Sequence, residues 1–159
     1  MVVRLSQLLD PARITLILQS RQHTAAISEV ALLLRSHPDV TDFDRFYEGL
    51  LARDRLDTTY LGHGVALPHS RSEYVTENVA AVGRSATGVA YEDNQPPVRL
   101  IFVIGTPKDQ PEDYLKLVSS LCRLIKDEAH RTALLTAATP TAFIATVAEL
   151  ENKILGPEK

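Results

Sequence analysis

The run Val-Arg-Leu-Ile-Phe-Val-Ile at residues 98–104 is the strongest apolar stretch of the chain. A single charged residue interrupts it, so it predicts a strand covered on both faces rather than a half-exposed one. Pro96 and Pro97 precede the run, and Gly105 and Pro107 are expected to end it. It is far shorter than the ~20 residues that cross a bilayer, which indicates a strand in a buried sheet.

Amphipathic helices are predicted on both sides of this strand. Apolar residues at helical spacing follow Thr24, an expected N-cap, and Asp42, which is expected to cap a helix that ends at Arg53. Two more helices are expected after the strand, one over residues 114–125 and one that begins near Pro140.

A second short strand is predicted at residues 79–82. Helices that lie before, between and after buried strands are typical of a layered α/β domain. The chain has 159 residues, which is about one domain's worth of sequence, so we expect residues 1–159 to form a single domain.

Composition excludes several classes of protein. A net charge of −3 and a pI near 5.9 give no basic footprint for nucleic acid. The single cysteine, Cys122, rules out an internal disulfide framework and fits a reducing compartment. The N-terminal residues lack the long apolar segment of a signal peptide. We therefore expect a cytoplasmic protein that does not insert into membranes.

The candidate site is the segment Leu-Gly-His-Gly-Val-Ala-Leu-Pro-His at residues 61–69. Its last residue, His69, follows a proline of fixed φ, and Gly62 and Gly64 are expected to bring amide groups close to a ligand. An imidazole of ordinary pKa is mostly neutral at cell pH and can act as a nucleophile. The segment lies where helical periodicity is lost, so a loop is expected. The pattern favours a histidine that accepts and passes on a group over a loop histidine bonded to backbone.

Other chemistries find less support. A metal pair of His63 and His69 would lack further ligands nearby, and Gly62 and Gly64 lack the third glycine of a dinucleotide fingerprint. No metal and no cofactor are therefore expected. Cys122 is expected to be a small buried side chain. The remaining histidines are expected to be solvated near helix ends: His23, His37 and His130.

Arg53 is the second residue of interest, because it closes a predicted helix just before the glycine segment. A solvated cation at a helix end is one interpretation. The other is a phosphate contact, because a phosphoryl group on His69 would carry nearly two negative charges and a planar guanidinium matches that charge well.

Three stretches carry a family resemblance: Ala-Arg-Asp-Arg-Leu-Asp-Thr-Thr at 52–59, Gly-His-Gly-Val-Ala-Leu-Pro-His at 62–69, and Asp-Asn-Gln-Pro-Pro-Val at 93–98. They resemble the enzyme IIA domains of the fructose–mannitol family in the bacterial phosphoenolpyruvate-dependent phosphotransferase system. The third stretch is similar to the nitrogen-regulatory members. The resemblance extends over nearly the whole chain.

The resemblance implies a mixed β-sheet of about five strands with helices on both faces. It implies that His69 is phosphorylated and that Arg53 and Thr59 help to hold the phosphoryl group. The donor would be the phosphocarrier HPr or its nitrogen-branch relative, and the recipient a membrane permease component or a regulated transporter.

Two departures from the family pattern leave the function open. Tyr114 stands where many members have a second histidine; its hydroxyl can donate a hydrogen bond to a phosphoryl group but cannot become cationic near neutral pH. His63 stands between the glycines. The hypotheses are therefore phosphotransfer, in a sugar-specific or nitrogen-regulatory role, and a non-transferring sensory or binding module.

A docking surface for the carrier is also predicted beside His69. The apolar residues of the segment are expected to be partly exposed there, with acidic residues at the rim. The apolar set is Tyr60, Leu61, Val65 and Leu67, and the acidic set is Asp109, Glu112 and Asp113.

Overall fold

The computed structural model describes residues 3–91 and 95–157, in which one mixed β-sheet carries six strands, close to the expectation of about five. The strand order is β1-β5-β6-β3-β2, and β4 also pairs with β6. The strands are β1 (Ile14–Thr15), β2 (Tyr60–Gly62), β3 (Val65–Ala66), β4 (His69–Ser72), β5 (Val79–Val89) and β6 (Val98–Pro107). The stretch at 93–98 lies in part outside the described residues.

Strand β6 is the centre of the sheet. It pairs antiparallel with β5, and it pairs parallel with β3 and, further along, with β4. Alternate residues point to opposite faces: Leu100 and Phe102 belong to one apolar cluster, Ile101 and Val103 to the other. The apolar run therefore forms a strand covered on both faces, as predicted. Both predicted strands continue further than expected: β5 reaches Val89 because it pairs with β6, and β6 continues to Pro107 because its last residues pair with β4.

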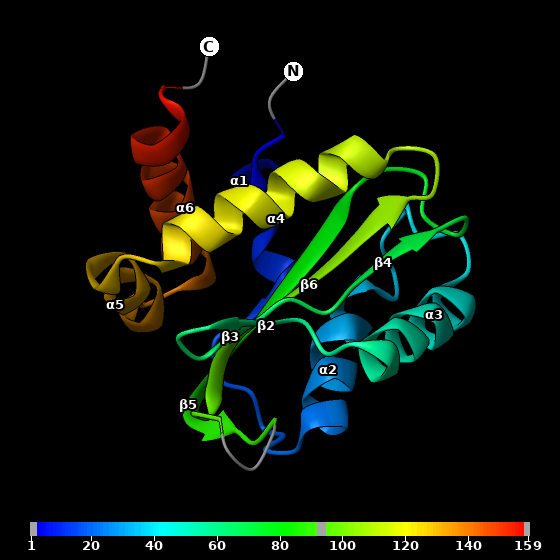
Figure 1. Ribbon diagram of the computed structural model, residues 1–159, viewed down its shortest axis with the longest axis horizontal. Helices are drawn as coiled ribbons and strands as arrows, with labels where there is room; N and C mark the ends of the chain where they lie inside the picture. Colours follow the sequence, from blue (N-terminus) through cyan, green and yellow to red (C-terminus); the bar gives the residue numbers. More distant parts are fainter. Residues whose placement is uncertain (1–2, 92–94, 158–159) are drawn as a thin grey trace.

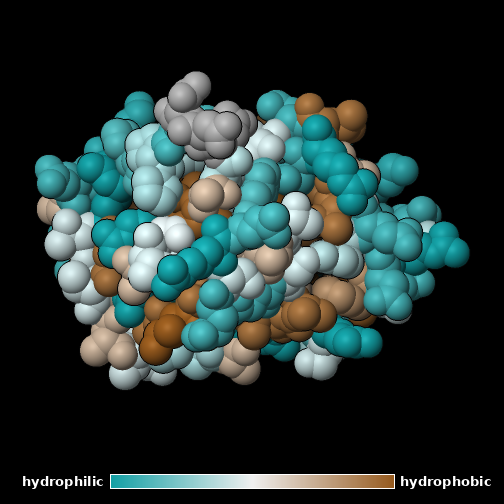
Figure 2. Space-filling view, turned by 90° about the horizontal axis from the view of Figure 1, so that it is seen from below, coloured by the Kyte–Doolittle hydropathy of each residue, from teal (hydrophilic) through white to brown (hydrophobic). Residues whose placement is uncertain are grey.

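Helices cover both faces of the sheet, as the resemblance implied (Figure 1). One face carries α1 (Leu5–Leu8), α4 (Pro111–Ile125), α5 (Glu128–Thr136) and α6 (Pro140–Leu155). The other carries α2 (His23–Ala31) and α3 (Phe43–Leu56), and the 3-10 turns are η1 (Pro11–Arg13) and η2 (Leu32–Leu34). On the face shown in Figure 2, hydrophilic residues predominate and hydrophobic ones form separate patches.

A side-chain cap marks the start of α3, α5 and α6. The Asp42 side chain accepts from the Arg45 amide at the start of α3, as predicted, and Thr139 caps α6 ahead of Pro140. Thr24 is not a cap: α2 begins one residue before it, after Gln22, which makes no capping bond. Helix α3 runs past Arg53 to Leu56, and α5 was not predicted.

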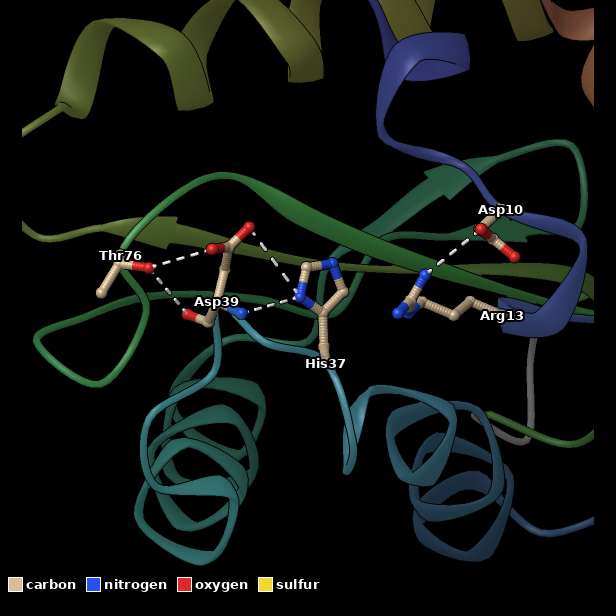
Figure 3. Close-up of polar contacts among 5 residues, drawn as sticks. All are labelled: Asp10, Arg13, His37, Asp39 and Thr76. Atoms are coloured by element: carbon tan, nitrogen blue, oxygen red, sulfur yellow. Dashed lines mark hydrogen bonds and ion pairs between the residues drawn. The ribbon is translucent and has the colours of Figure 1, made fainter.

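The histidines near helix ends are half-buried rather than solvated. The His37 Nδ1 accepts the Asp39 amide at 3.0 Å, and the Thr76 hydroxyl donates to Asp39 at 3.3 Å (Figure 3). Burial, followed by the charge of Arg13, lowers the pKa of His37. Arg13 itself pairs with Asp10 at 3.6 Å. His37 thus serves as an acceptor that shapes the loop after η2.

Candidate functional site

The sequence predicted a loop at His69, but His69 is the first residue of β4. The Pro68 carbonyl accepts from the Ile104 amide at 3.0 Å, and His69 pairs with Ile104 in parallel register. Only 5% of His69 is exposed. The catalytic candidate is therefore held on the edge of the central sheet, where its backbone cannot shift freely.

The glycine segment before it makes a tight turn away from His69. Gly62, His63 and Gly64 have φ values of 90°, 57° and 76°. A Cβ at Gly64 would lie 3.2 Å from the Pro97 carbonyl, and Gly64 accepts from the Arg99 amide at 2.7 Å. The glycines let the chain pack closely against the start of β6 and do not offer amides to a ligand at His69. The expectation that Gly62 and Gly64 bring amide groups close to a ligand is therefore wrong.

The orientation of the imidazole is set by backbone. The His69 Nδ1 lies 2.9 Å from the Leu67 carbonyl, with the Thr59 hydroxyl 3.4 Å from the same nitrogen. Because a carbonyl oxygen only accepts, Nδ1 carries the proton and Nε2, on the other side of the ring, keeps its lone pair. Tyr114 stacks on the ring with 4.6 Å between centroids and an interplanar angle of 28°.

A cleft of about 710 Å³ opens over His69, between α3 and the N-terminal end of α4. Three of its lining residues are cationic and none is acidic. The lining residues are Gly49, Arg53, His69, Ser70, Arg71, Lys108, Pro111, Tyr114 and Leu115. The three cations form no ion pair with any other residue that the structure describes. The cleft is therefore suited to an anion.

Arg53 and Arg71 reach this cleft from different elements. The Arg53 guanidinium donates to the Asp57 carbonyl at 2.8 Å, which fixes it at the end of α3. Arg71 lies two residues after His69 on β4 and hence on the same side of the strand. It is exposed, and within the described part of the chain its side chain has no hydrogen-bond partner. The spacing of two residues from His69 could have indicated Arg71 from the sequence. Neither Arg71 nor Lys108 was predicted.

The surroundings of His69 favour its neutral form. Burial is the main cause that lowers the pKa of His69, and the charges of Arg53 and Arg71 lower it further. The hydrogen bond to Leu67 and the charge of Asp54 act in the opposite direction. The net effect keeps Nε2 unprotonated at neutral pH, which is the state that a nucleophile needs.

The structure brings some of the predicted residues to His69 and places others away from it. Arg53, Thr59 and Tyr114 surround His69, whereas His63 is exposed at the turn and Cys122 is partly exposed on α4. In residues 3–91 and 95–157, no three His, Cys, Asp or Glu side chains are grouped as a metal ion would need, and no helix is long and apolar enough to span a membrane.

Two residues of the predicted docking surface are buried, so the prediction is wrong for them. Val65 and Leu67 are 1% and 0% exposed, because β3 and the residue after it turn inward against β6. The large apolar side chains exposed near the cleft are instead Leu115, which lines it, and Leu56, one turn beyond Arg53 on α3.

The chain matches the family "Phosphoenolpyruvate-dependent sugar phosphotransferase system, EIIA 2" over residues 7–150. The chain belongs to this EIIA family. The resemblance stated from the sequence and the α/β fold are thereby confirmed.

Two relatives and one solved structure give the degree of similarity within the EIIA family. A nitrogen regulatory protein of Pseudomonas aeruginosa is 26% identical over 95% of this chain and 99% of its own. A fructose-specific EIIABC component of Bacillus subtilis is 31% identical over 89% of this chain, which spans 22% of that protein's length. The crystal structure of IIA-Ntr from Neisseria meningitidis superposes with a TM-score of 0.82 and 26% identity, over 89% of this chain and 97% of that one.

Proposed function

We propose that this EIIA domain is a phosphohistidine carrier of the phosphotransferase system. It accepts a phosphoryl group on His69 from HPr or the nitrogen-branch phosphocarrier, and passes it to an acceptor or acts as a phosphorylation-dependent regulator. One observation carries the proposal: Nδ1 of His69 faces a carbonyl acceptor, which leaves Nε2 as a lone pair in a cleft lined by cations.

The transfer follows from this arrangement. Nε2 of His69 forms a bond to phosphorus while the phosphorus–nitrogen bond of the donor breaks, and that electron pair returns to the donor's ring nitrogen. As the His69 ring gains positive charge, the Leu67 carbonyl continues to accept from Nδ1–H and stabilises it. The second transfer reverses these steps on the acceptor. Positioning and charge stabilisation supply the catalysis, as is general for phosphoryl transfer.

The residues around His69 take separate roles in this proposal. Arg53 and Arg71 neutralise the phosphoryl oxygens from two sides. The Thr59 hydroxyl steadies the ring at Nδ1, and Tyr114 supports one face of the ring and offers a hydroxyl to the phosphoryl group. No cofactor takes part. Such a role places the protein in the cytoplasm, with a permease component or a regulated transporter as the acceptor or target.

A second candidate is a binding module that no longer transfers phosphate. The observation that favours it is the stacking of Tyr114 on a His69 that is 5% exposed, since an incoming phosphoryl group must pass beside the tyrosine. In that case the cationic cleft would recognise a partner without covalent chemistry.

Labelling separates the two candidates. The purified protein is incubated with radiolabelled phosphoenolpyruvate, enzyme I, and either HPr or the nitrogen-branch carrier, in separate arms. We expect an acid-labile, base-stable label that disappears in His69→Ala and persists in His63→Ala. A wild-type protein that stays unlabelled with both carriers, each shown to be active on another IIA protein, would favour the binding module. The carrier that labels faster indicates the branch.

A further inference from the structure

The last buried residue of α3 is a charged one. Its buried residues follow helical spacing as Phe46, Leu50 and Asp54, and the first two lie in the apolar core. Asp54 occupies the place where a third apolar side chain would continue the stripe, and it is 8% exposed. A carboxylate is rarely buried unless a partner holds it.

The partner is a histidine from another helix. The His23 Nε2, at the start of α2, lies 2.9 Å from Asp54 Oδ2, in a close contact rather than an aligned hydrogen bond, because Nε2 has no hydrogen-bond partner among the described residues. The His23 ring stacks on Tyr91, just past the end of β5, with 3.8 Å between centroids and an interplanar angle of 19°. These three residues are referred to as the anchor. Apolar residues of similar volume often replace a buried polar or charged pair without loss of stability, so stability alone does not explain the anchor.

The anchor fastens the turn that carries Arg53. In the last turn of α3, Asp54 is buried, whereas Arg55 is exposed and Leu56 is 85% exposed. Helix ends have unsatisfied carbonyls and fray unless something holds them. Arg53 precedes Asp54 directly, and it points to the cleft while Asp54 points to α2.

The same turn also leads to Thr59. The Thr58 hydroxyl donates to the Asp54 carbonyl at 3.2 Å, and the next residue, Thr59, contacts His69. The Thr58 bond is to the backbone of Asp54, which a side-chain substitution leaves in place, so the Asp54 carboxylate is expected to act on the site through Arg53. The charge of Asp54 also raises the pKa of His69, which shows that the carboxylate lies within electrostatic reach of the site.

We propose that Asp54 is a positioning residue that keeps Arg53 aligned with the phosphoryl group on His69. His23, which stacks on Tyr91, holds Asp54 in place. The inference rests on the proposed phosphotransfer function. Asp54 does not touch the reacting atoms; it acts through Arg53. Misplacement of a charged group by about 1 Å is enough to slow a reaction strongly, so the effect should be large for a residue outside the cleft.

The deciding variant is Asp54→Leu, which completes the apolar stripe of α3 and so should not reduce stability. Glu48→Gln is the matched control, because it removes one negative charge from an exposed position of the same helix. Tyr91→Phe is a second control: the ring stack stays, and the lost hydroxyl has no hydrogen-bond partner among the described residues. Initial labelling rates and thermal unfolding are measured for each.

We expect Asp54→Leu to label about tenfold more slowly with an unchanged unfolding temperature, while both controls label at the wild-type rate. In an Arg53→Ala background, Asp54→Leu should cause no further loss, because its effect passes through Arg53. Full activity of Asp54→Leu, or losses that multiply in the double variant, would overturn the proposal. If Asp54→Leu does not fold, His23→Gln takes its place with the same expectations.

A second readout does not depend on labelling. In amide NMR spectra, Asp54→Leu should shift or broaden signals of residues 53–59 more than those of residues 43–50, and it should lower the pKa of His69. Unchanged signals at 53–59 would contradict the anchor even if the wild type labels normally. If the wild type stays unlabelled but these signals do move in Asp54→Leu, the proposed function is contradicted and the anchor is still supported.

Discussion

Tyr114 stacks on the imidazole of His69, with 4.6 Å between the ring centroids and 28° between the ring planes. The contact joins the first turns of α4 to the start of β4 and covers one face of the proposed nucleophile. A residue in this position can support the ring, offer its hydroxyl to a bound phosphoryl group, or restrict access, and these roles give different outcomes on substitution.

Tyr114→Phe separates the ring from the hydroxyl. If the hydroxyl donates to the phosphoryl group, its loss should slow labelling by about two- to tenfold, which corresponds to a hydrogen bond of ~0.5–1.5 kcal/mol. Tyr114→His should label at the wild-type rate or slightly faster. Initial rates with a saturating carrier measure both. Equal rates for Tyr114→Phe and wild type would show that the ring alone matters.

Arg53→Ala should slow transfer far more than it affects folding. A charge-assisted hydrogen bond to a phosphoryl group contributes ~1.5–3 kcal/mol, so the labelling rate should fall roughly ten- to a hundredfold. Arg53→Lys should recover only part of the rate, because an ammonium cannot reproduce the guanidinium fork. Quench-flow labelling and urea unfolding provide the two measurements. A variant that unfolds, or that labels normally, would refute this role.

The pH dependence of labelling follows from the lowered pKa of His69. Because burial and the two arginines hold this pKa below the ordinary 6.5, Nε2 stays free as pH falls to about 6.5, and the rate should decrease only below that value. Arg71→Gln should raise the pKa of His69 and move the decrease to higher pH. NMR titration of the imidazole tests the shift; a titration curve unaffected by Arg71→Gln would argue against its proximity.

The same shift affects stability. A histidine whose pKa is lower in the folded state stabilises the fold fully above the unfolded pKa, and loses that contribution as pH falls through the folded pKa. His69 and His37 both have lowered pKa values, so the free energy of unfolding should begin to decrease below about pH 6.5. Urea unfolding of His37→Gln, compared with wild type from about pH 8 to pH 5, should show a smaller decrease.

Gly105→Ala should destabilise the domain. A Cβ at Gly105 would lie 2.8 Å from the Phe46 ring and 3.0 Å from Val79, so core side chains must move. Overpacking of this kind costs about 1–3 kcal/mol. Gly49→Ala is the matched control: its Cβ would meet Ser70 at an ordinary 3.6 Å, and alanine favours a helix by about 0.5–1 kcal/mol. A neutral Gly105→Ala would mean that Phe46 repacks freely.

Local patterns decided much of the fold. The apolar run of β6 forms a strand covered on both faces because every position in it except Arg99 is apolar and buried, and Asp42 starts α3 because its side chain satisfies a free amide of the first turn. The pairing of Pro68 and His69, with Arg53 and Thr59 before it, pointed to the site through a family resemblance. These signals lie within short segments of the chain, so the sequence alone carries them.

Tertiary contacts decided the rest. His69 becomes a strand residue because β4 pairs with β6, a partner distant in sequence. The separate pairing of β3 with β6 buries Val65, and Leu67 just after β3 is buried as well, although the sequence suggested that both were exposed. The state of Nε2 depends on the Leu67 carbonyl and on burial of the ring, which exist only once the chain has folded.

The sequence by itself determined the type of each long element and the identity of the proposed nucleophile, because both depend on residues close together along the chain. Only the tertiary structure placed Lys108 beside His69 and joined Asp54 to His23. Those relationships arise where separate helices and strands meet, and the free energy of such contacts depends on distance and burial, which no local pattern records.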